Sequence, residues 1–143
     1  MNGNRDVKYA VGIPTKVITT AETGNAVDRR SYDVFEAVVN VGIPSTDDTV
    51  TVKLQDAVED PATPGSPLAS DWGDLASATT GAISAAGQKV IQVGPTKGKA
   101  FIRAIATPAG DSIGGMPVAV HYVLRGGAKS HPETVADVVL GFA

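Results

Sequence analysis

Two apolar segments decide how this chain folds: Lys-Ala-Phe-Ile-Arg-Ala-Ile-Ala-Thr at Lys99–Thr107, and Met-Pro-Val-Ala-Val-His-Tyr-Val-Leu-Arg at Met116–Arg125. Both are rich in β-branched and aromatic residues, which favour strands. The residues between them, Pro-Ala-Gly-Asp-Ser-Ile-Gly-Gly, are of the kinds that form turns. The pattern predicts a hairpin of two strands. Because both strands carry apolar residues on both faces, we expect a second sheet to cover one face and a neighbour or arm to cover the other.

Two further strands are predicted upstream. Ser31–Val41 places Phe35, Ala37 and Val39 on one face, and Thr49–Ala57 alternates apolar and polar residues. We expect these two strands to form an antiparallel pair. Shorter strands are predicted at Val7–Ile13, which Pro14 should end, at Lys16–Thr20 and at Val90–Val93, whereas Ala76–Gln88 fits a strand, a loop or a weak helix.

This succession of short strands and turns predicts an all-β fold. We expect a jelly-roll-like β-sandwich of about eight antiparallel strands with flexible or partner-binding terminal arms; an immunoglobulin-like sandwich is the second choice. The expected division is an N-terminal arm or edge segment at residues 1–14, the sandwich at 15–127, and a C-terminal arm at 128–143. The C-terminal arm either begins a helix at Ser130–Glu133 or pairs as a strand at Val138–Phe142.

Composition excludes several functions. The chain has 143 residues, a formal net charge of −3 and no cysteine. An acidic balance argues against a nucleic-acid groove, and the lack of cysteine excludes disulfides and thiolate metal sites. No apolar run approaches the roughly 20 residues of a membrane span, and no secretory signal is visible. We therefore expect a soluble chain made in a cytoplasm, without nucleic-acid or membrane partners.

No set of residues specifies a catalytic site, a cofactor or a metal. The segment Gly94–Lys99 has glycines and lysines like a phosphate-binding loop, but its spacing is short and a strand follows instead of a helix. His121 and His131 lack further metal ligands at a suitable spacing. Asp47 and Asp48 are interpreted as solvated turn acids. We therefore predict that the chain is not an enzyme.

A carbohydrate-binding or adhesin-like module is an alternative. The single tryptophan, Trp72, could stack on a sugar together with Tyr32 or Tyr122. The competing interpretation is that Trp72 fills a gap between the sheets.

Several segments taken in order carry a resemblance to a known family. They are Ser31–Gly42, Thr51–Asp56 (Thr-Val-Lys-Leu-Gln-Asp), Asp71–Leu75 (Asp-Trp-Gly-Asp-Leu), Lys99–Thr107 and Val118–Gly127. This order resembles the head decoration or cement proteins of tailed bacteriophages, which have a jelly-roll-like β-sandwich. The C-terminal arm departs from the shorter ends of that family.

The resemblance implies a structural virion protein that binds the outer surface of the capsid and bridges neighbouring capsid subunits. The implied partners are the major capsid protein and other copies of the chain, as a dimer or trimer. A phage tail component is a weaker alternative. We expect contacts from the N-terminal segment, the Pro-rich loop and the C-terminal arm: Tyr9, Val11, Ile13, Pro61, Pro64, Pro67, Val135, Val138, Leu140 and Phe142.

Overall fold

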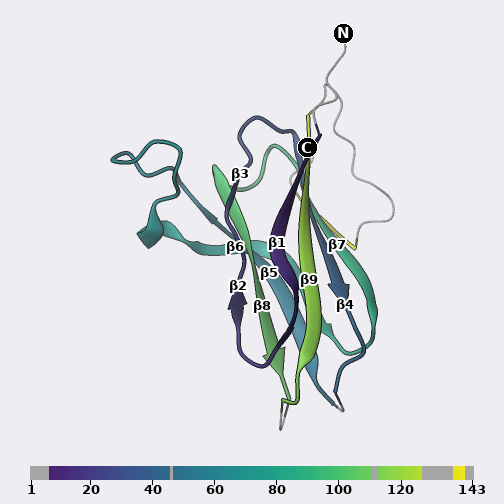
Figure 1. Cartoon of the computed structure of the whole chain (residues 1–143). Coiled ribbons are helices and arrows are strands. Elements are labelled where there is room, and N and C mark those ends of the chain that lie inside the picture. Colours follow the sequence, from purple (N-terminus) through teal and green to yellow (C-terminus); the bar gives the residue numbers. More distant parts are fainter. Residues whose placement is uncertain (1–6, 46, 111–112, 127–136, 141–143) are drawn as a thin grey trace.

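Two β-sheets lie face to face in the computed structural model, which describes residues 7–45, 47–110, 113–126 and 137–140 (Figure 1). The strands are β1 (Val7–Ile18), β2 (Glu22–Thr23), β3 (Val27–Asp28), β4 (Val34–Val41), β5 (Thr49–Ala57), β6 (Gly73–Ile83), β7 (Gly87–Val93), β8 (Phe101–Ala109), β9 (Met116–Arg125) and β10 (Val138–Leu140), with a short 3₁₀ turn, η1 (Ala69–Asp71), before β6.

The strand order confirms the jelly-roll-like sandwich. Sheet A has the order β1-β9-β4-β7-β10, and sheet B has the order β2-β8-β5-β6, with β3 also paired to β8. Since β2 and β3 both pair with β8, they act as one interrupted strand. Apart from β10, this leaves eight strands in two sheets of four. Most connections pass from one sheet to the other, as in a jelly roll.

The predicted hairpin and the predicted upstream pair are both wrong. Strand β8 lies in sheet B and β9 in sheet A, and β5 and β4 are divided between the sheets in the same way. Each strand has one fully apolar face, and these faces meet across the core instead of the strand edges meeting side by side. The turn residues between β4 and β5, and between β8 and β9, form connections that pass from one sheet to the other.

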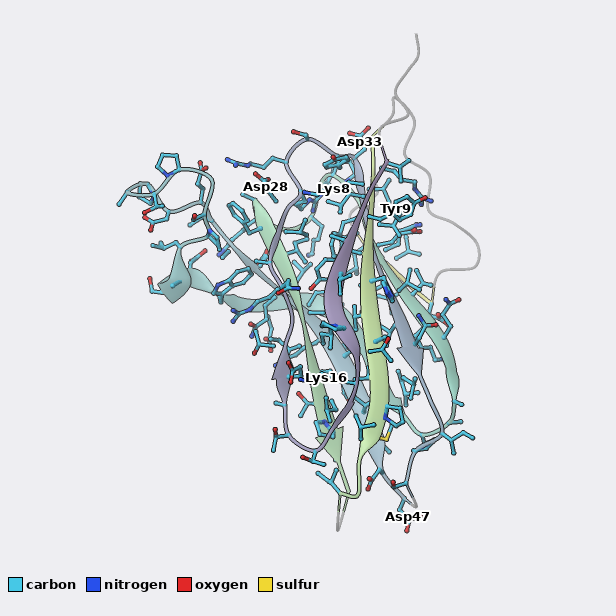
Figure 2. All side chains as sticks on the ribbon, in the orientation of Figure 1. Lys8, Tyr9, Lys16, Asp28, Asp33 and Asp47 are labelled. Atoms are coloured by element: carbon cyan, nitrogen blue, oxygen red, sulfur yellow. The ribbon has the colours of Figure 1, made fainter. Side chains whose placement is uncertain are left out.

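Asp48 links the β4–β5 connection to the β8–β9 connection by hydrogen bonds. Its Oδ2 accepts hydrogen bonds from the N–H groups of Gly114, at 2.9 Å, and Gly115, at 3.2 Å. The side chain is 4% exposed, so the expectation of a solvated turn acid is wrong for Asp48, although Asp47 is exposed (Figure 2). Asp48 is buried because it satisfies backbone donors that the turn from β8 to β9 leaves without strand partners.

Strand β1 continues through Pro14, which corrects the predicted stop at that residue. It pairs with β9 from Val7 to Ile18, with irregularities between Val11 and Ile13 and between Ile13 and Lys16. Proline is tolerated here because β1 lies at the edge of sheet A, where a missing N–H leaves no neighbour unpaired. The proposed domain boundaries remain predictions, and residue 127 lies outside the described residues.

The C-terminal arm contributes a strand. Val138–Leu140 form β10, which pairs in parallel with β7, and the side chains of Val138 and Leu140 pack against the core. The predicted helix start at residues 130–133 lies outside the described residues. The undecided stretch 76–88 holds most of β6, a turn and the start of β7.

Tyr122 joins the two sheets at the centre of the core. Its side chain is fully buried on β9, its hydroxyl donates to the carbonyl of Asn25 at 2.8 Å, and it accepts the N–H of Ala104 of β8 at 2.8 Å. Burial raises the pKa of this phenol to about 12. Gly12 makes room for the ring, because a Cβ there would lie 2.5 Å from two ring atoms.

We expect Tyr122→Phe to lower the free energy of unfolding by about 1–3 kcal/mol, because the buried N–H of Ala104 and the partly buried carbonyl of Asn25 lose their partner. Denaturation in urea measures the change. Tyr9→Phe is the matched control, since Tyr9 is 76% exposed. Equal stability of the two variants would contradict this role for the Tyr122 hydroxyl.

Candidate interaction surface

The outer faces of the two sheets differ in chemistry. On sheet B, Val52, Leu54 and Ala104 point into the core, so the alternate residues of β5 and β8 point outward. These outward residues are mostly polar: Thr49, Thr51, Lys53, Gln55, Arg103 and Thr107. This is the usual composition of a solvent-facing sheet surface.

The loop between β5 and β6 covers part of this polar face. The guanidinium of Arg103 lies 4.1 Å from the centre of the Trp72 ring and donates to Gln55 Oε1 from Nε, at 3.0 Å, and from Nη2, at 2.8 Å. Arg30 lies over the ring of Phe101 in the same way, at 5.5 Å. Side chains of the same molecule therefore cover the part of sheet B near Phe101 and Arg103, while Thr107 stays exposed.

The outer face of sheet A carries more apolar residues than that of sheet B. Phe35, Val39 and Leu124 point into the core, and the residues that alternate with such core positions include several valines beside polar residues such as Asn40, Gln88 and His121. We call this surface the valine face and define it by Val7, Tyr9, Val11, Val38, Val90, Val123 and Val139. The cross-strand register places Tyr9 beside Val123, and Val11 beside His121, which in turn lies beside Val38.

Several of these side chains are accessible to a partner. Tyr9 is 76% exposed, Val7 and Val11 are each 45% exposed, and Val139 is 38% exposed. A face of an antiparallel sheet that carries this many apolar groups is typical of an interaction surface.

Two buried polar side chains lie among the valines on the outer face of sheet A. Glu36 is 8% exposed and Gln92 is fully buried, and Gln92 Nε2 donates to Glu36 Oε2 at 2.5 Å. Arg125 Nη2 lies 2.9 Å from the same carboxylate oxygen. A buried ion pair adds little net stability, but it penalises alternative strand registers, because a slip would leave the carboxylate unpaired.

The predicted contact residues lie in different parts of the structure. Tyr9 and Val11 lie on the valine face, and Pro61 and Pro64 are exposed on the loop between β5 and β6. Pro67 is half-buried, and Val138 and Leu140 pack against the core. Val135 and Phe142 lie outside the described residues. The contact role of these residues remains a prediction.

Ile13 is fully buried, so its side chain is not available to a partner. The strand irregularity between Val11 and Ile13 adds a residue and turns Ile13 into the core. Sequence reasoning also missed Val38, Val90 and Val139. The only sequence feature that pointed to these three valines was the presence of apolar residues on both faces of the strands.

The glycine-lysine loop before β8 is held by a buried arginine. Arg29 donates from Nη2 to the carbonyl of Gly94 at 2.8 Å and from Nη1 to the carbonyl of Lys97. Burial lowers the pKa of the Arg29 guanidinium from its ordinary value. These carbonyls face a cation of the same chain, an arrangement unlike a loop whose N–H groups cradle a phosphate.

Tyr122, predicted as a possible partner of Trp72 in sugar stacking, is fully buried and cannot contact a ligand. Trp72 is half-buried, with one ring face against Arg103. Among the described residues, no group of three or more His, Cys, Asp or Glu side chains could hold a metal ion. No helix within the described ranges is long and apolar enough to cross a membrane.

The loop between β5 and β6 projects from the side of the sandwich and is anchored by ion pairs (Figure 1). Arg30 contacts Glu59 at 3.0 Å and Asp28 at 2.6 Å, and Lys99 contacts Asp71 at 3.0 Å. The N–H of Gly65, followed by the Arg30 guanidinium, lowers the pKa of Glu59. The N–H of Val58, followed by Lys99, lowers the pKa of Asp71.

No protein-family model and no curated protein matches this chain. The solved structures similar to it include the following three. The SPBc2 prophage-derived protein YomS is 14% identical over 87% of this chain and 97% of its own, with a TM-score of 0.46. A chain from the Bacillus endospore appendages, a novel family of disulfide-linked pili, is 12% identical over 88% of this chain and 93% of its own, with a TM-score of 0.43.

The third structure is infectious bursal disease virus, Gx strain. One of its chains is 7% identical over 91% of this chain, with a TM-score of 0.53. The match covers 35% of the viral chain, so this chain spans about a third of the viral chain's length. At this identity the likeness shows a shared fold.

Acid should weaken the anchoring of the projecting loop. Folding lowers the pKa of Glu59. The ionised carboxylate therefore contributes its full stabilisation of the loop above the unfolded pKa of about 4.3, and this stabilisation is lost as the pH falls through the lower folded pKa. We expect the amide proton shift of Gly65, followed by NMR, to titrate with a midpoint below about 4.3.

In Glu59→Gln the Gly65 amide should lose this titration, because its acceptor no longer ionises. A midpoint at or above the value of an unperturbed glutamate, or an unchanged titration in the variant, would contradict this anchoring.

Proposed function

We propose that the chain is a non-enzymatic structural virion protein, a head decoration or cement protein that docks on the outer surface of a phage capsid. The observation that carries this proposal is the valine face. A sheet surface built from exposed valines and a tyrosine is costly to leave in water, and a partner that covers it gains the free energy of that burial.

The energetics suit attachment to a repetitive shell. Full burial of an exposed valine side chain contributes about 1.5–3 kcal/mol, and each of these valines, at most 45% exposed, contributes a fraction of that. A few such contacts give a modest affinity after the entropy of association is subtracted. Repetition of the same contact over a symmetric capsid, together with contacts between neighbouring copies, turns a modest affinity into durable attachment.

Two further observations support the proposal. The order of sequence segments resembles phage decoration proteins, and the same type of fold occurs in a chain of a virus structure. In this proposal the partners are the major capsid protein and other copies of the chain, as a dimer or trimer. The chain is made in the host cytoplasm and resides on the outer surface of the virion.

We expect the double variant Val38→Lys, Val139→Lys to lose at least about tenfold in affinity for empty heads of the phage that encodes the chain, because each lysine brings an unpaired charge into an apolar contact. Co-sedimentation with the heads measures binding. Thr107→Lys, on the polar outer face of sheet B, is the matched control and should bind like the wild type.

Failure of the wild-type protein to sediment with heads would overturn the proposed function. Equal binding by the valine-face variant and the control would overturn the assignment of the capsid contact to sheet A.

A further inference from the structure

The C-terminal strand β10 is held on the sandwich by a complete set of backbone contacts of its own. The N–H of Asp137 donates to the carbonyl of Val90 at 3.0 Å, and the Asp137 carboxylate accepts the N–H of Val90 at 2.8 Å. At the other end, the carbonyl of Leu140 accepts the N–H of Gly94 at 2.6 Å. The segment Asp137–Leu140 is therefore fixed at both ends by hydrogen bonds to β7 and to the residue that follows β7.

Side chains add two apolar anchors and an ion pair to these bonds. Val138 and Leu140 pack against the core, whereas Val139 between them is 38% exposed on the valine face. Asp137 also lies 3.8 Å from the Nζ of Lys89. One segment commonly binds another in this way, by adding its backbone to a sheet edge and placing alternate side chains against the core. Asp137–Leu140 thus carries in itself the groups that recognise the edge of β7.

The place that β10 occupies is remote from the strand that precedes it in the chain. Within sheet A, β4 and β7 lie between β9 and β10. Neighbouring strands are about 4.8 Å apart, so closure within one copy spans about 14 Å across the sheet. The eleven residues 126–136 connect Arg125 to Asp137. A chain of that length spans up to about 40 Å, which is much more than closure within one copy requires.

The same length of chain is enough to reach a second copy. A domain of this size is about 35 Å across, so the β7 edge of an adjacent copy can lie within reach of the end of β9. Docking on a neighbour makes the same hydrogen bonds and buries the same two apolar side chains as docking within one copy. The balance between the two states therefore depends mainly on effective concentration, which is millimolar for partners held close together.

We propose that neighbouring copies of this chain exchange β10, so that Asp137–Leu140 of one copy completes sheet A of the next. The inference rests on the proposed function, in which copies lie side by side on a capsid. The exchange is either reciprocal across a two-fold axis or passes from copy to copy around a ring. In both cases Val139 keeps its place beside Gln92. The valine face, which we assign to the capsid contact, is therefore unchanged by the exchange.

A native ion pair reports the exchange without any engineered residue. A carbodiimide joins the Lys89 ammonium to the Asp137 carboxylate as an amide, with loss of water, because the two groups lie 3.8 Å apart. Protein of natural isotopic composition is mixed with nitrogen-15-labelled protein at about 1 mM, without heads, and the crosslinked peptides are identified by mass spectrometry. Docking within one copy joins light peptides to light and heavy to heavy, whereas exchange also gives mixed crosslinks.

We expect at least about one in twenty Lys89–Asp137 crosslinks to be mixed, since a millimolar neighbour competes with closure within one copy. Lys53 and Asp74, which lie 2.9 Å apart on the paired strands β5 and β6, are the matched control and should give no mixed crosslinks. Leu140→Asp should abolish the mixed Lys89–Asp137 crosslinks, because a carboxylate replaces an apolar anchor. The Lys53–Asp74 crosslinks of this variant should stay at the wild-type level.

Two results would overturn the inference. One is a mixed fraction for Lys89–Asp137 that is no higher than the mixed fraction for Lys53–Asp74. The other is an unchanged mixed fraction in Leu140→Asp, which would show that the crosslinks arise from collisions between copies. Because this measurement uses no heads, failure of the wild-type protein to sediment with heads affects the proposed function alone.

Discussion

The tie between the two sheets at Tyr122 constrains the rest of the structure. A single hydroxyl on sheet A satisfies a buried N–H of β8 and a partly buried carbonyl of the β2–β3 connection. A buried polar group without partners is costly, so the sheets are held at one spacing and one alignment. Gly12 must stay without a side chain to admit the ring, and Phe35 packs against it with ring centres 5.1 Å apart. The core permits one relative placement of β1, β4, β8 and β9.

This alignment gives the sandwich two unlike outer faces. Sheet B faces outward with threonines and charged groups, and Trp72 and the projecting loop cover part of it. Sheet A faces outward with several valines around the buried carboxylate of Glu36, which pairs with the half-buried Arg125. Exposed valines are less favourable in water than polar residues. The difference between the faces is the physical basis for the proposal that sheet A makes the contact with a partner.

The projecting loop is the second rigid feature of the molecule. Its turns are fixed by prolines, a left-handed glycine and carboxylate acceptors, and its stem is fixed by the ion pairs of Arg30 and Lys99. Exposed ion pairs contribute little to global stability. Here they hold the direction of the loop relative to the sandwich.

Sequence by itself determined the strands and their faces, because alternation of apolar and polar residues is a local property. Thr49–Ala57 and Met116–Arg125 have the predicted bounds, and Phe35, Ala37 and Val39 point into the core as predicted. Tyr9, Val11, Pro61 and Pro64 are exposed, and their contact role stays a prediction. Tertiary structure alone decided which strands pair, because a turn of seven or eight residues can close a hairpin or span two sheets equally well. It also decided that Ile13 and Asp48 are buried, since a strand irregularity and an unpaired turn backbone are invisible in the residue pattern. The valine face exists only once five strands lie side by side, because no single strand carries enough of it to be recognised.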